Sequence, residues 1–499
     1  MNSLRAALAA LALLLTPVVA AQSRLQVVLP EVPTTLDPAE ARTASELFVV
    51  NQIYETLFRF TPEGALEGHL AADWSYATAT RLRVRLTTNV SFSDGAPLDA
   101  LAVQASLERL LERLQREPGA RLLEAVTSVE VQDALTVVIV TAEPYAPLMA
   151  HLTHPATAIV PGGHGRDLDR APVGSGAYEL AEWLPDERIV LRANDDYRNS
   201  APAVPEIEFR TELDEDALIA GLSSGALHLA PGASGHVAHA LKGNLIDETV
   251  TVAVLPGWSA VQLGVNAAHP KLASLNVRQA LALAVDKSSL VESVPGGLAQ
   301  PAVSALPPSV RLAPQGLDEP YPYEPDAARD LLVAEGVTEL TLTLDLMADP
   351  ELEAVAAALA HMLAGVGVNL ETRVLTASQY RAQLEDRDLQ LFLTRWSTPT
   401  LDPDQTLYSA LHSSAIPAGN ASHYRVAAVD SLLAEARNST SEVVRAADYL
   451  DVIETVLTDL PVISLYYPQV AVATGAALTL HGPAPAWFLI DLALATLAD

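Results

Sequence analysis

The stretch PVGSGAYEL, Pro172–Leu180, places a Gly-Ser-Gly turn directly before an aromatic residue. Backbone amides in such a turn can cradle a phosphate. A dinucleotide-binding loop, however, needs a third glycine three residues after Gly176, where Glu179 stands, and the sequence contains no Gly-Lys-Ser/Thr phosphate loop. The segment is therefore predicted not to bind a nucleotide.

Hydrolysis is the second chemistry that residue types suggest. A Gly-x-Ser-x-Gly pattern occurs at Gly221–Gly225, with Ser223 at its centre and His228 close behind. A serine nucleophile on such a turn follows a strand and precedes a helix, whereas the residues before this one have a helical pattern that ends at glycine. We predict a helix C-terminus here. The carboxylates Asp402 and Asp404 flank a proline, which is typical of a solvated turn.

Metal binding is the third candidate chemistry. His151 and His154 are three residues apart, as are His236 and His239, so each pair could share one helical face. The chain has no cysteine and no His-Glu-x-x-His pattern, and neither pair has an acidic ligand at motif spacing. We therefore predict ordinary histidines, no bound metal and no cofactor.

The elements that must position these residues begin with an α+β pattern. Alternating apolar residues predict a strand at 81–86, and Asp99 is a predicted N-cap for a helix whose apolar stripe begins at Val103. A further strand is predicted at 134–140. Together these elements predict a small lobe between about residues 66 and 170.

The second half of the chain has a strand–helix–strand rhythm. Residues 339–346 and 368–374 alternate as strands do, and residues 352–362 between them have helical spacing. Such units favour an α/β sheet covered by helices, with a ligand site where strands end at a crevice. A short strand is also predicted at Leu25–Leu29.

Length and charge limit the class of protein. At 499 residues the chain exceeds the roughly 250 to 300 residues at which a single core stops growing, so two or three lobes are expected. Its 61 acidic and 30 basic residues give a net charge of −31, which repels phosphate backbones and anionic lipid surfaces. Nucleic acid is therefore not an expected partner.

The first residues predict export. Arg5 precedes an unbroken apolar run at 6–20 that ends in small residues, too short to span a bilayer, so residues 1–21 are predicted to be a signal peptide. No later segment has membrane-spanning length, and no cysteine is present to form a disulfide or carry a lipid anchor. We expect a periplasmic monomer without stable membrane insertion.

Eight segments, taken in order, resemble one family. They are Thr35–Trp74, Val90–Ala100, Pro172–Trp183, Asn194–Arg210, Gly264–Val291, Tyr323–Gly336, Thr394–Trp396 and Leu460–Tyr467. In this order they resemble the extracytoplasmic solute-binding proteins of family 5, the peptide- and nickel-binding components of ABC transporters. Each segment alone is a weak signal, but together they cover nearly all of the chain after the predicted signal peptide.

The resemblance implies an α/β, two-lobed fold of the periplasmic binding protein type (class II) with an additional small α+β lobe. The implied division is lobe I at 22–65, 172–258 and 470–499, lobe II at 66–171, and lobe III at 259–469. Gly174, Gly176 and Tyr178 match the segment through which the family's chain returns from the small lobe, so they are expected to be structural.

The resemblance also implies a function without catalysis. Two lobes joined by a hinge close on a ligand, and the closed form then docks on a membrane permease. The expected partners are a peptide or other small-molecule ligand and an ABC permease. By match to the family's cleft, ligand-binding residues are predicted at Val32, Pro33, Thr34, Arg395 and Trp396.

One departure from the family pattern bears on the ligand. Members that hold free peptides often carry an aspartate three residues after the tryptophan, where this chain has Pro399. Asp402 and Asp404 are therefore added to the predicted ligand-binding residues as possible substitutes.

Several functions stay open at this point. An oligopeptide or dipeptide is the expected ligand, and nickel or a metal chelate on the same fold is the first alternative. A secreted serine hydrolase using Ser223 is the second. A chaperone or sensor partner without transport is the third.

Overall fold

The computed structural model describes residues 24–498 except 62, 117–121, 163–166, 212–213, 244–249, 294–296, 482–483 and 485. The predicted signal peptide, 1–21, lies outside the described residues. Within the described ranges, no helix has both the length and the apolar character needed to cross a bilayer.

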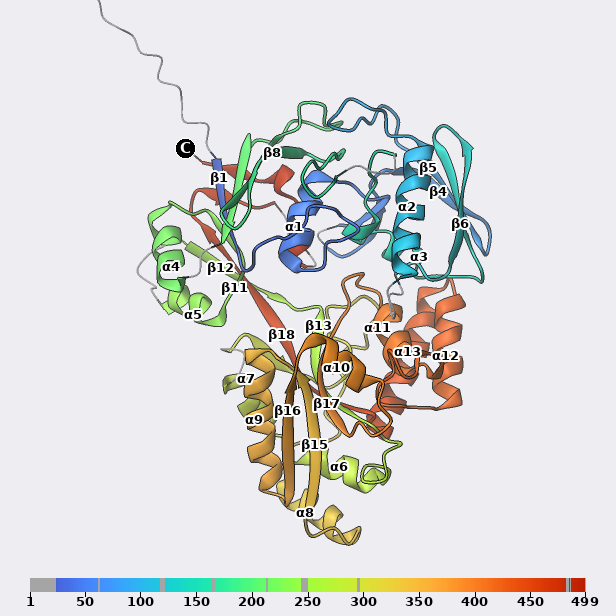
Figure 1. Cartoon of the computed structure of the whole chain (residues 1–499), viewed down its shortest axis with the longest axis vertical. Helices are drawn as coiled ribbons and strands as arrows, with labels where there is room; N and C mark the ends of the chain where they lie inside the picture. The colour runs from blue at the N-terminus through green and yellow to red at the C-terminus, as the bar shows by residue number, and fades with distance from the viewer. Residues whose placement is uncertain are drawn as a thin grey trace, which may run out of the picture.

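One mixed sheet runs through both lobe I and lobe III (Figure 1). Its strands, in spatial order, are β16 (Val368–Leu375), β15 (Leu340–Met347), β17 (Leu391–Ser397), β13 (Ser259–Val265), β18 (Val462–Gly475), β11 (Leu229–Ala233), β1 (Arg24–Leu29), β10 (Glu206–Thr211), β9 (Arg188–Ala193) and β8 (Tyr178–Leu184). Beside this row, β12 (Val250–Pro256) and β14 (Ala299–Pro301) also pair with β18.

Lobe III contains the strand–helix–strand unit that the sequence predicts. β15 and β16 run parallel and are connected through α9 (Pro350–Ala364). Asp349 caps α9 by accepting hydrogen bonds from the backbone N–H groups of Glu351 and Leu352, which stabilises the first turn by about 1 kcal/mol. The remaining helices around this sheet are α6 (Leu275–Leu283), α7 (Lys287–Ser293), α8 (Pro325–Ala334) and α10 (Ala377–Leu384).

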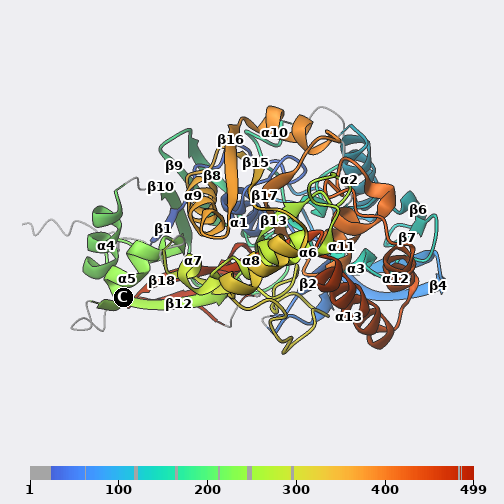
Figure 2. The ribbon, with the colours of Figure 1, turned by 90° about the horizontal axis from the view of Figure 1, so that it is seen from below.

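A second helical layer closes lobe III on the side of lobe II. It consists of α11 (Pro403–Leu411), the short η2 (Ser413–Ala415), α12 (Ala427–Asn438) and α13 (Glu442–Asp459). These helices pack around their own apolar core, which contains Leu407, Leu433 and the fully buried Tyr449. In both ribbon views the layer lies next to the sheet of lobe II (Figures 1 and 2).

Lobe I is built around α1 (Ala44–Ile53). Thr43 and Glu46 form a reciprocal capping box at its N-terminus, and Phe48 on its buried face meets the rings of Phe209 and Trp487 edge-on at 5.8 and 5.6 Å. The other elements of this lobe are α4 (Glu215–Ser224), α5 (Gly235–Gly243), η3 (Trp487–Leu489), η4 (Leu492–Leu494), β19 (Leu478–Thr479) and β20 (Thr496–Leu497).

Lobe II is a four-stranded antiparallel sheet covered by one helix. Its strands, in spatial order, are β4 (Ala71–Thr78), β5 (Arg81–Leu86), β7 (Thr136–Thr141) and β6 (Val126–Asp133). The covering helix is α2 (Ala100–Leu114), and Asp99 is its N-cap as predicted. The smaller elements are β2 (Phe58–Phe60), β3 (Leu66–Gly68), α3 (Leu148–His151) and η1 (Pro155–Thr157). Phe58 packs into this core, and the β2–β3 hairpin lies across the predicted boundary at 65/66, which stays a prediction.

Two neighbouring segments connect lobe I with lobe III. β18 pairs with β13 of lobe III near its start and with β12 and β11 of lobe I near its end. The second connection is the turn from β12 to β13, where a Cβ on Gly257 would lie 1.9 Å from the carbonyl oxygen of Pro468 in β18. The two connections thus lie in direct contact, and we refer to this contact as the hinge.

The Gly-Ser-Gly segment crosses α1 at the junction of lobes I and II. A Cβ on Gly174 or Gly176 would lie 2.0 or 2.6 Å from the carbonyl oxygen of Ile53, so only glycine fits at either position. The hydroxyl of Ser175 is buried and donates to Glu55 at 2.8 Å. Tyr178 is buried and donates to backbone carbonyls of Val204 and Leu492. These contacts are structural, as predicted.

Candidate ligand-binding cleft

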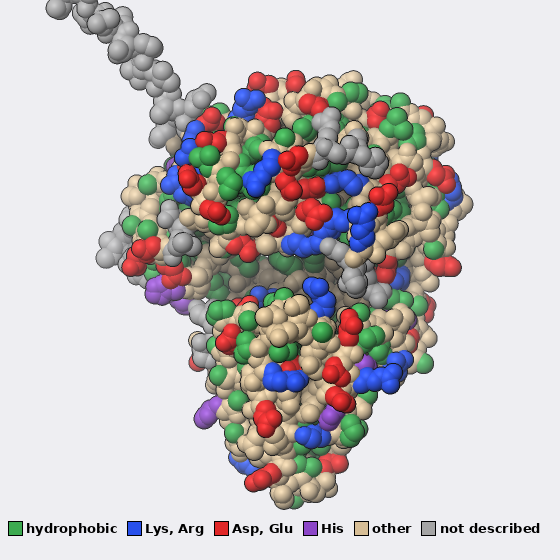
Figure 3. Space-filling model, in the orientation of Figure 1, with side chains coloured by type: hydrophobic (Ala, Val, Ile, Leu, Met, Phe, Trp, Pro, Cys, Tyr) green, Lys and Arg blue, Asp and Glu red, His purple; other side chains and the backbone are tan. Residues whose placement is uncertain are grey.

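The molecule is hollowed between lobe III and the other two lobes, with Lys and Arg side chains along part of the upper rim (Figure 3). A cavity of about 340 Å³ lies here. Lobes I and II contribute Ala39, Ala41, Arg42, Leu47, Leu110, Arg113, Leu114, Leu122, His154 and Ala156, and the hinge and lobe III contribute Trp258, Ser397, Pro399 and Gln405. The cleft is therefore lined from all three lobes.

The upper wall of the cleft carries cationic groups. Arg42 lies in the loop before α1, and Arg113 lies in the last turn of α2. The guanidinium of Arg113 pairs with Glu40 at 2.6 and 2.9 Å. None of the described residues that line the cavity is Asp or Glu. Among the described lining residues, the acidic or basic side chains are thus Arg42 and Arg113, in a chain whose net charge is −31.

Glu46 fixes the backbone of this wall. Its carboxylate accepts hydrogen bonds from the backbone N–H of Arg42 at 2.8 Å, from the backbone N–H of Thr43 at 3.0 Å, and from the hydroxyl of Thr34 at 2.6 Å. Burial opposes ionisation of Glu46, but these donors outweigh burial and lower its pKa. Glu46 therefore stays charged and holds the loop that carries Arg42.

His154 adds a neutral group to the upper wall. Burial, with a smaller contribution from His151, lowers the pKa of His154 to about 4. Its Nδ1 accepts a hydrogen bond from the backbone N–H of Ala156 at 3.1 Å, which caps η1. The imidazole is uncharged at neutral pH and adds no positive charge to the cleft.

The lower wall is the segment that follows β17. The backbone N–H of Thr398 donates to the carbonyl of Trp258 at 2.9 Å, which ties this segment to the hinge. Pro399 lines the cavity at the position where the family resemblance leads one to expect an aspartate. Gln405, in the first turns of α11, accepts a hydrogen bond from the Thr400 hydroxyl at 2.9 Å and also lines the cavity.

Asp402 and Asp404 are held by arginines of lobe III. Asp402 is fully buried and accepts from Arg445 at 2.6 and 3.0 Å and from Arg311 at 2.9 Å. Burial alone would raise the pKa of Asp402, but Arg445 and Arg311 outweigh burial and lower it. Asp404 is buried as well and binds both arms of the Arg437 guanidinium at 2.9 Å. Neither carboxylate lines the cavity.

Arg437 also bridges lobe III to lobe II. Its Nη1 lies 2.7 Å from a carboxylate oxygen of Glu124, and its backbone carbonyl accepts from the N–H of Ala146 at 2.8 Å. The Tyr145 hydroxyl donates to Asp404 at 3.2 Å. The Asp404–Arg437 pair is thus an anchor point between two lobes, at the side of the cleft.

The five other residues that the sequence predicts as ligand contacts lie outside the cavity. Val32 and Pro33 line a separate hollow of about 20 Å³ beside β8 and β9, and Thr34 is engaged with Glu46. Arg395 pairs with Glu351 at 2.8 Å, and the half-buried Trp396 packs against the core of the α11–α13 layer. The structure therefore does not bring the predicted set together in one pocket, and their contact with ligand stays a prediction.

Sequence reasoning missed the arginines and Trp258. Arg113 sits on an amphipathic helix whose sequence does not reveal that its last turn faces another lobe. A usable signal was present at Arg42, which lies inside the family-like segment Thr35–Trp74. Pro399 is the one position singled out from the resemblance that does line the cavity.

The remaining candidate motifs are accounted for by structure. Ser223 lies in the last turn of α4, and Gly225 ends that helix with φ +77°, as predicted. His151 is buried in lobe II, whereas His236 and His239 lie on α5 in lobe I. In the part of the chain that the structure describes, no three His, Asp or Glu side chains form a group that could hold a metal ion.

Comparison with known proteins identifies the family. The model of the bacterial extracellular solute-binding proteins, family 5 Middle, matches residues 65–418, which is well over half of the chain. The chain therefore belongs to family 5 of the bacterial extracellular solute-binding proteins, and it is a solute-binding component of the ABC-importer type. The family and its structural neighbours are binding proteins rather than enzymes.

Individual relatives agree with this family. The chain is 26% identical over 461 residues, covering 89% of each protein, to the glutathione-binding protein GsiB of Shigella flexneri serotype 5b (strain 8401). Among solved structures it is similar to the ABC transporter-associated periplasmic binding protein DppA of Helicobacter pylori in complex with the peptide STSA (TM-score 0.79, 22% identity, 96% of this chain and 98% of that chain). It is equally similar to NikZ of Campylobacter jejuni in complex with Ni(L-His) (TM-score 0.78, 22% identity, 95% and 99%). The fold is thus that of the two-lobed periplasmic binding proteins.

Proposed function

We propose that this protein captures a short, carboxylate-bearing peptide in the cleft between its lobes, in the periplasm, and delivers it to the membrane permease of an ABC importer. The observation that carries the proposal is the charge of the cleft lining. Arg42 and Arg113 line the cavity, and none of the described residues that line it is Asp or Glu, although the chain as a whole is strongly acidic.

Arginine suits this ligand chemistry. A guanidinium binds a carboxylate through two parallel N–H donors, and such charge-assisted bonds are about twice as strong as neutral ones. Arg113 already pairs with Glu40 at the rim, so a ligand carboxylate would join an existing ion pair. Pro399 offers no anion for a peptide ammonium, so the proposed grip is on the carboxylate end of the ligand.

A relative supports the same ligand class. The Shigella flexneri relative is named a glutathione-binding protein, and glutathione is a short peptide with two carboxylates. A bare metal cation is disfavoured in the same place, because it would meet two guanidinium groups. Nickel held in an organic complex remains the alternative to be tested.

Closure of the lobes is the proposed capture step. The ligand would touch lobes I and II through Arg42 and Arg113, and lobe III through Gln405. A ligand shifts a two-state equilibrium only by its differential affinity for the two states. Contacts made from both walls exist only in the closed state, so ligand binding favours closure.

The test is calorimetric titration of the purified full chain with four probes: glutathione, trialanine, trialanine amide and Ni(L-His). Trialanine amide keeps the ammonium group but lacks the carboxylate. We expect glutathione and trialanine to bind, and the amide to bind about tenfold or more weakly, as loss of a charged hydrogen bond implies. Equal affinity for trialanine and its amide would show that the cleft does not bind the ligand through its carboxylate. Binding of Ni(L-His) and of none of the peptides would show that the ligand is a metal complex.

A variant pair locates the site. Arg42→Met keeps most of the apolar stem and removes the guanidinium, so glutathione affinity should fall about tenfold or more. Arg188→Met, which removes an arginine of β9 paired with Glu182 outside the cleft, is the matched control and should leave the affinity unchanged. If both variants bind glutathione like the original protein, the ligand does not contact Arg42.

A further inference from the structure

A second hollow lies within lobe I at its junction with lobe II, away from the cleft. It has a volume of about 130 Å³ and is bordered by α1, the β2–β3 hairpin and the C-terminal segment around η3 and η4. A cavity of this size exceeds the space of roughly 10 to 15 Å³ that one water needs, and it can hold a small organic molecule. None of its lining residues also lines the cleft.

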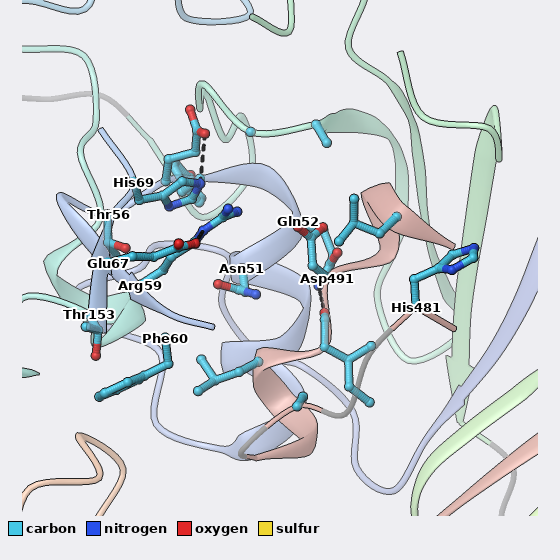
Figure 4. Close-up of a pocket in the computed structure, with 18 of the residues that line it drawn as sticks. Asn51, Gln52, Thr56, Arg59, Phe60, Glu67, His69, Thr153, His481 and Asp491 are labelled. Carbon is cyan, nitrogen blue, oxygen red and sulfur yellow. Dashed lines mark hydrogen bonds and ion pairs between the residues drawn. The ribbon is translucent and has the colours of Figure 1, made fainter. Parts of the chain in front are cut away.

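The hollow has an apolar part and a polar part. Phe60, Leu489, Ile490 and Leu494 supply apolar surface, whereas Tyr197 adds an aromatic wall. In Figure 4, Arg59, Glu67 and His69 lie on one side, Gln52, Asp491 and His481 lie on the other, and Asn51 lies between the two groups. An apolar body and a polar head could therefore be held at once.

The charges of this hollow do not balance among its own residues. Three carboxylates, Glu55, Glu67 and Asp491, face one arginine, Arg59. Arg59 pairs with Glu67 at 2.7 Å, and Glu55 is held from outside the hollow by Arg198.

Asp491 is the carboxylate that remains. It accepts one hydrogen bond, from the backbone N–H of Ala493 at 2.9 Å, and it has no cationic partner among the described residues. One negative charge in the hollow is thus left without a counter-ion from the described chain.

Two further polar side chains, His69 and Asn51, border the hollow. Burial lowers the pKa of His69 to about 4, so its imidazole is neutral. Its Nε2 lies 3.0 Å from a carboxylate oxygen of Glu55. Its buried Nδ1 has no hydrogen-bond partner in the described structure. The side-chain amide of Asn51 has none within the described ranges either.

We propose that this hollow is a second small-molecule site, which binds an organic ammonium with a short apolar body. The ammonium group pairs with Asp491 and donates to Asn51, and the apolar body lies on Leu489 and Leu494. This ligand supplies the positive charge that the hollow lacks. It differs in sign from the carboxylate-bearing ligand of the cleft, so the two sites do not compete.

The second site is independent of lobe closure. No described residue of lobe III lines it, and Gly176, which lines it, packs against the end of α1. Its occupation therefore requires no change in the position of lobe III.

The test uses isoamylammonium chloride as probe and isoamyl alcohol as its uncharged counterpart of similar shape. Calorimetric titration of the full chain should give saturable one-to-one binding of the ammonium and about tenfold or more weaker binding of the alcohol. Equal binding of the two, or no saturable binding, would overturn the proposal.

A matched pair of variants identifies the carboxylate. Asp491→Asn retains an oxygen for the N–H of Ala493, so the fold should survive, and it should lower ammonium affinity about tenfold or more. Asp326→Asn, on exposed α8 of lobe III, should bind the ammonium unchanged. Equal affinities in the two variants would show that Asp491 does not bind the ammonium.

Two readouts separate this proposal from that for the cleft. Asp491→Asn should bind glutathione normally, and Arg42→Met should bind isoamylammonium normally. Leu494→Ala is a second variant of the same hollow, with an exposed side chain and little risk to folding, and it should weaken the ammonium and the alcohol equally. An unchanged affinity for both probes in Leu494→Ala would contradict the assigned place of the apolar body.

Discussion

The cleft and the lobe I hollow differ in the sign of their charge and in what must move to fill them. The cleft is lined by arginines from two lobes and by no described carboxylate, whereas the hollow is lined by three carboxylates and one arginine. The cleft spans the hinge, and the hollow does not. Net charge therefore predicts neither site, because each lining is set by the few side chains that the fold turns inward.

The difference between the cleft and the hollow can be tested by a substitution in lobe III, which lines the cleft only. Arg445→Met should have the largest effect, because it leaves the fully buried Asp402 with only part of its ion-pair partners. Removal of one partner of a buried pair costs about 3 to 5 kcal/mol, and the remaining Arg311 places the expected loss at about 3 kcal/mol. Urea unfolding at neutral pH measures it. Glutathione binding should weaken because the Asp402 segment carries Gln405, and ammonium binding should not change.

The loss of folding stability in Arg445→Met should depend on pH, and its sign follows from the pKa of Asp402. The pKa of Asp402 is lowered in the folded state, so its pairing stabilises the fold above the unfolded pKa of about 3.9 and ceases to do so as pH falls through the folded value. The stability difference between the original protein and Arg445→Met should therefore be full at pH 7 and shrink below pH 4. The double variant Asp402→Asn/Arg445→Met is the control and should be less destabilised than Arg445→Met alone. A pH-independent difference would contradict this account.

Gly257→Ala tests the hinge and should have an intermediate effect. A Cβ there would lie 1.9 Å from the carbonyl oxygen of Pro468, so the two connecting segments must separate, at a cost of about 1 to 3 kcal/mol. Small-angle scattering with and without glutathione should show impaired closure, while ammonium binding stays normal. Gly162→Ala, whose new Cβ would have 3.8 Å to its nearest neighbour, is the matched control. Normal closure in Gly257→Ala would show that the lobes bend elsewhere.

Glu124→Gln should have the smallest effect. It removes the ion pair with Arg437 that joins lobe II to lobe III beside the cleft, while Asp404 keeps Arg437 in place. A partly exposed pair of this kind contributes up to about 1 kcal/mol, so glutathione affinity should fall up to about fivefold. Titration with glutathione in low and high salt measures this difference. Added salt should lower the glutathione affinity of the original protein more than that of the variant, because only the original protein has the ion pair that salt screens. An unchanged glutathione affinity of the variant at low salt would show that the Glu124–Arg437 pair does not stabilise the closed state.

Much of the fold could be predicted from the sequence where the pattern is local. Asp99 caps α2, the alternating stretch at 81–86 is β5, and the 339–374 region is a strand–helix–strand unit, because capping and periodicity depend on neighbours within a few residues. The glycine after Ser223 likewise ends a helix, because its positive φ is a local requirement.

The candidate site could be predicted only in part. Asp402 and Asp404 are neighbours of a proline in sequence, but whether they face ligand or arginine depends on Arg445 and Arg437, which come from other helices. Arg113 reaches the cleft only because α2 ends against another lobe. Such pairings join residues far apart in the chain, and no local pattern encodes them.

The sequence by itself determined the family, the type of most elements and the structural role of the Gly-Ser-Gly segment, because these follow from composition, spacing and backbone geometry. Only the tertiary structure decided that the cleft is lined by arginines and that the hollow in lobe I is lined by carboxylates. The physical reason is that the charge of a site is the sum over side chains from separate segments, and their meeting depends on packing of whole lobes.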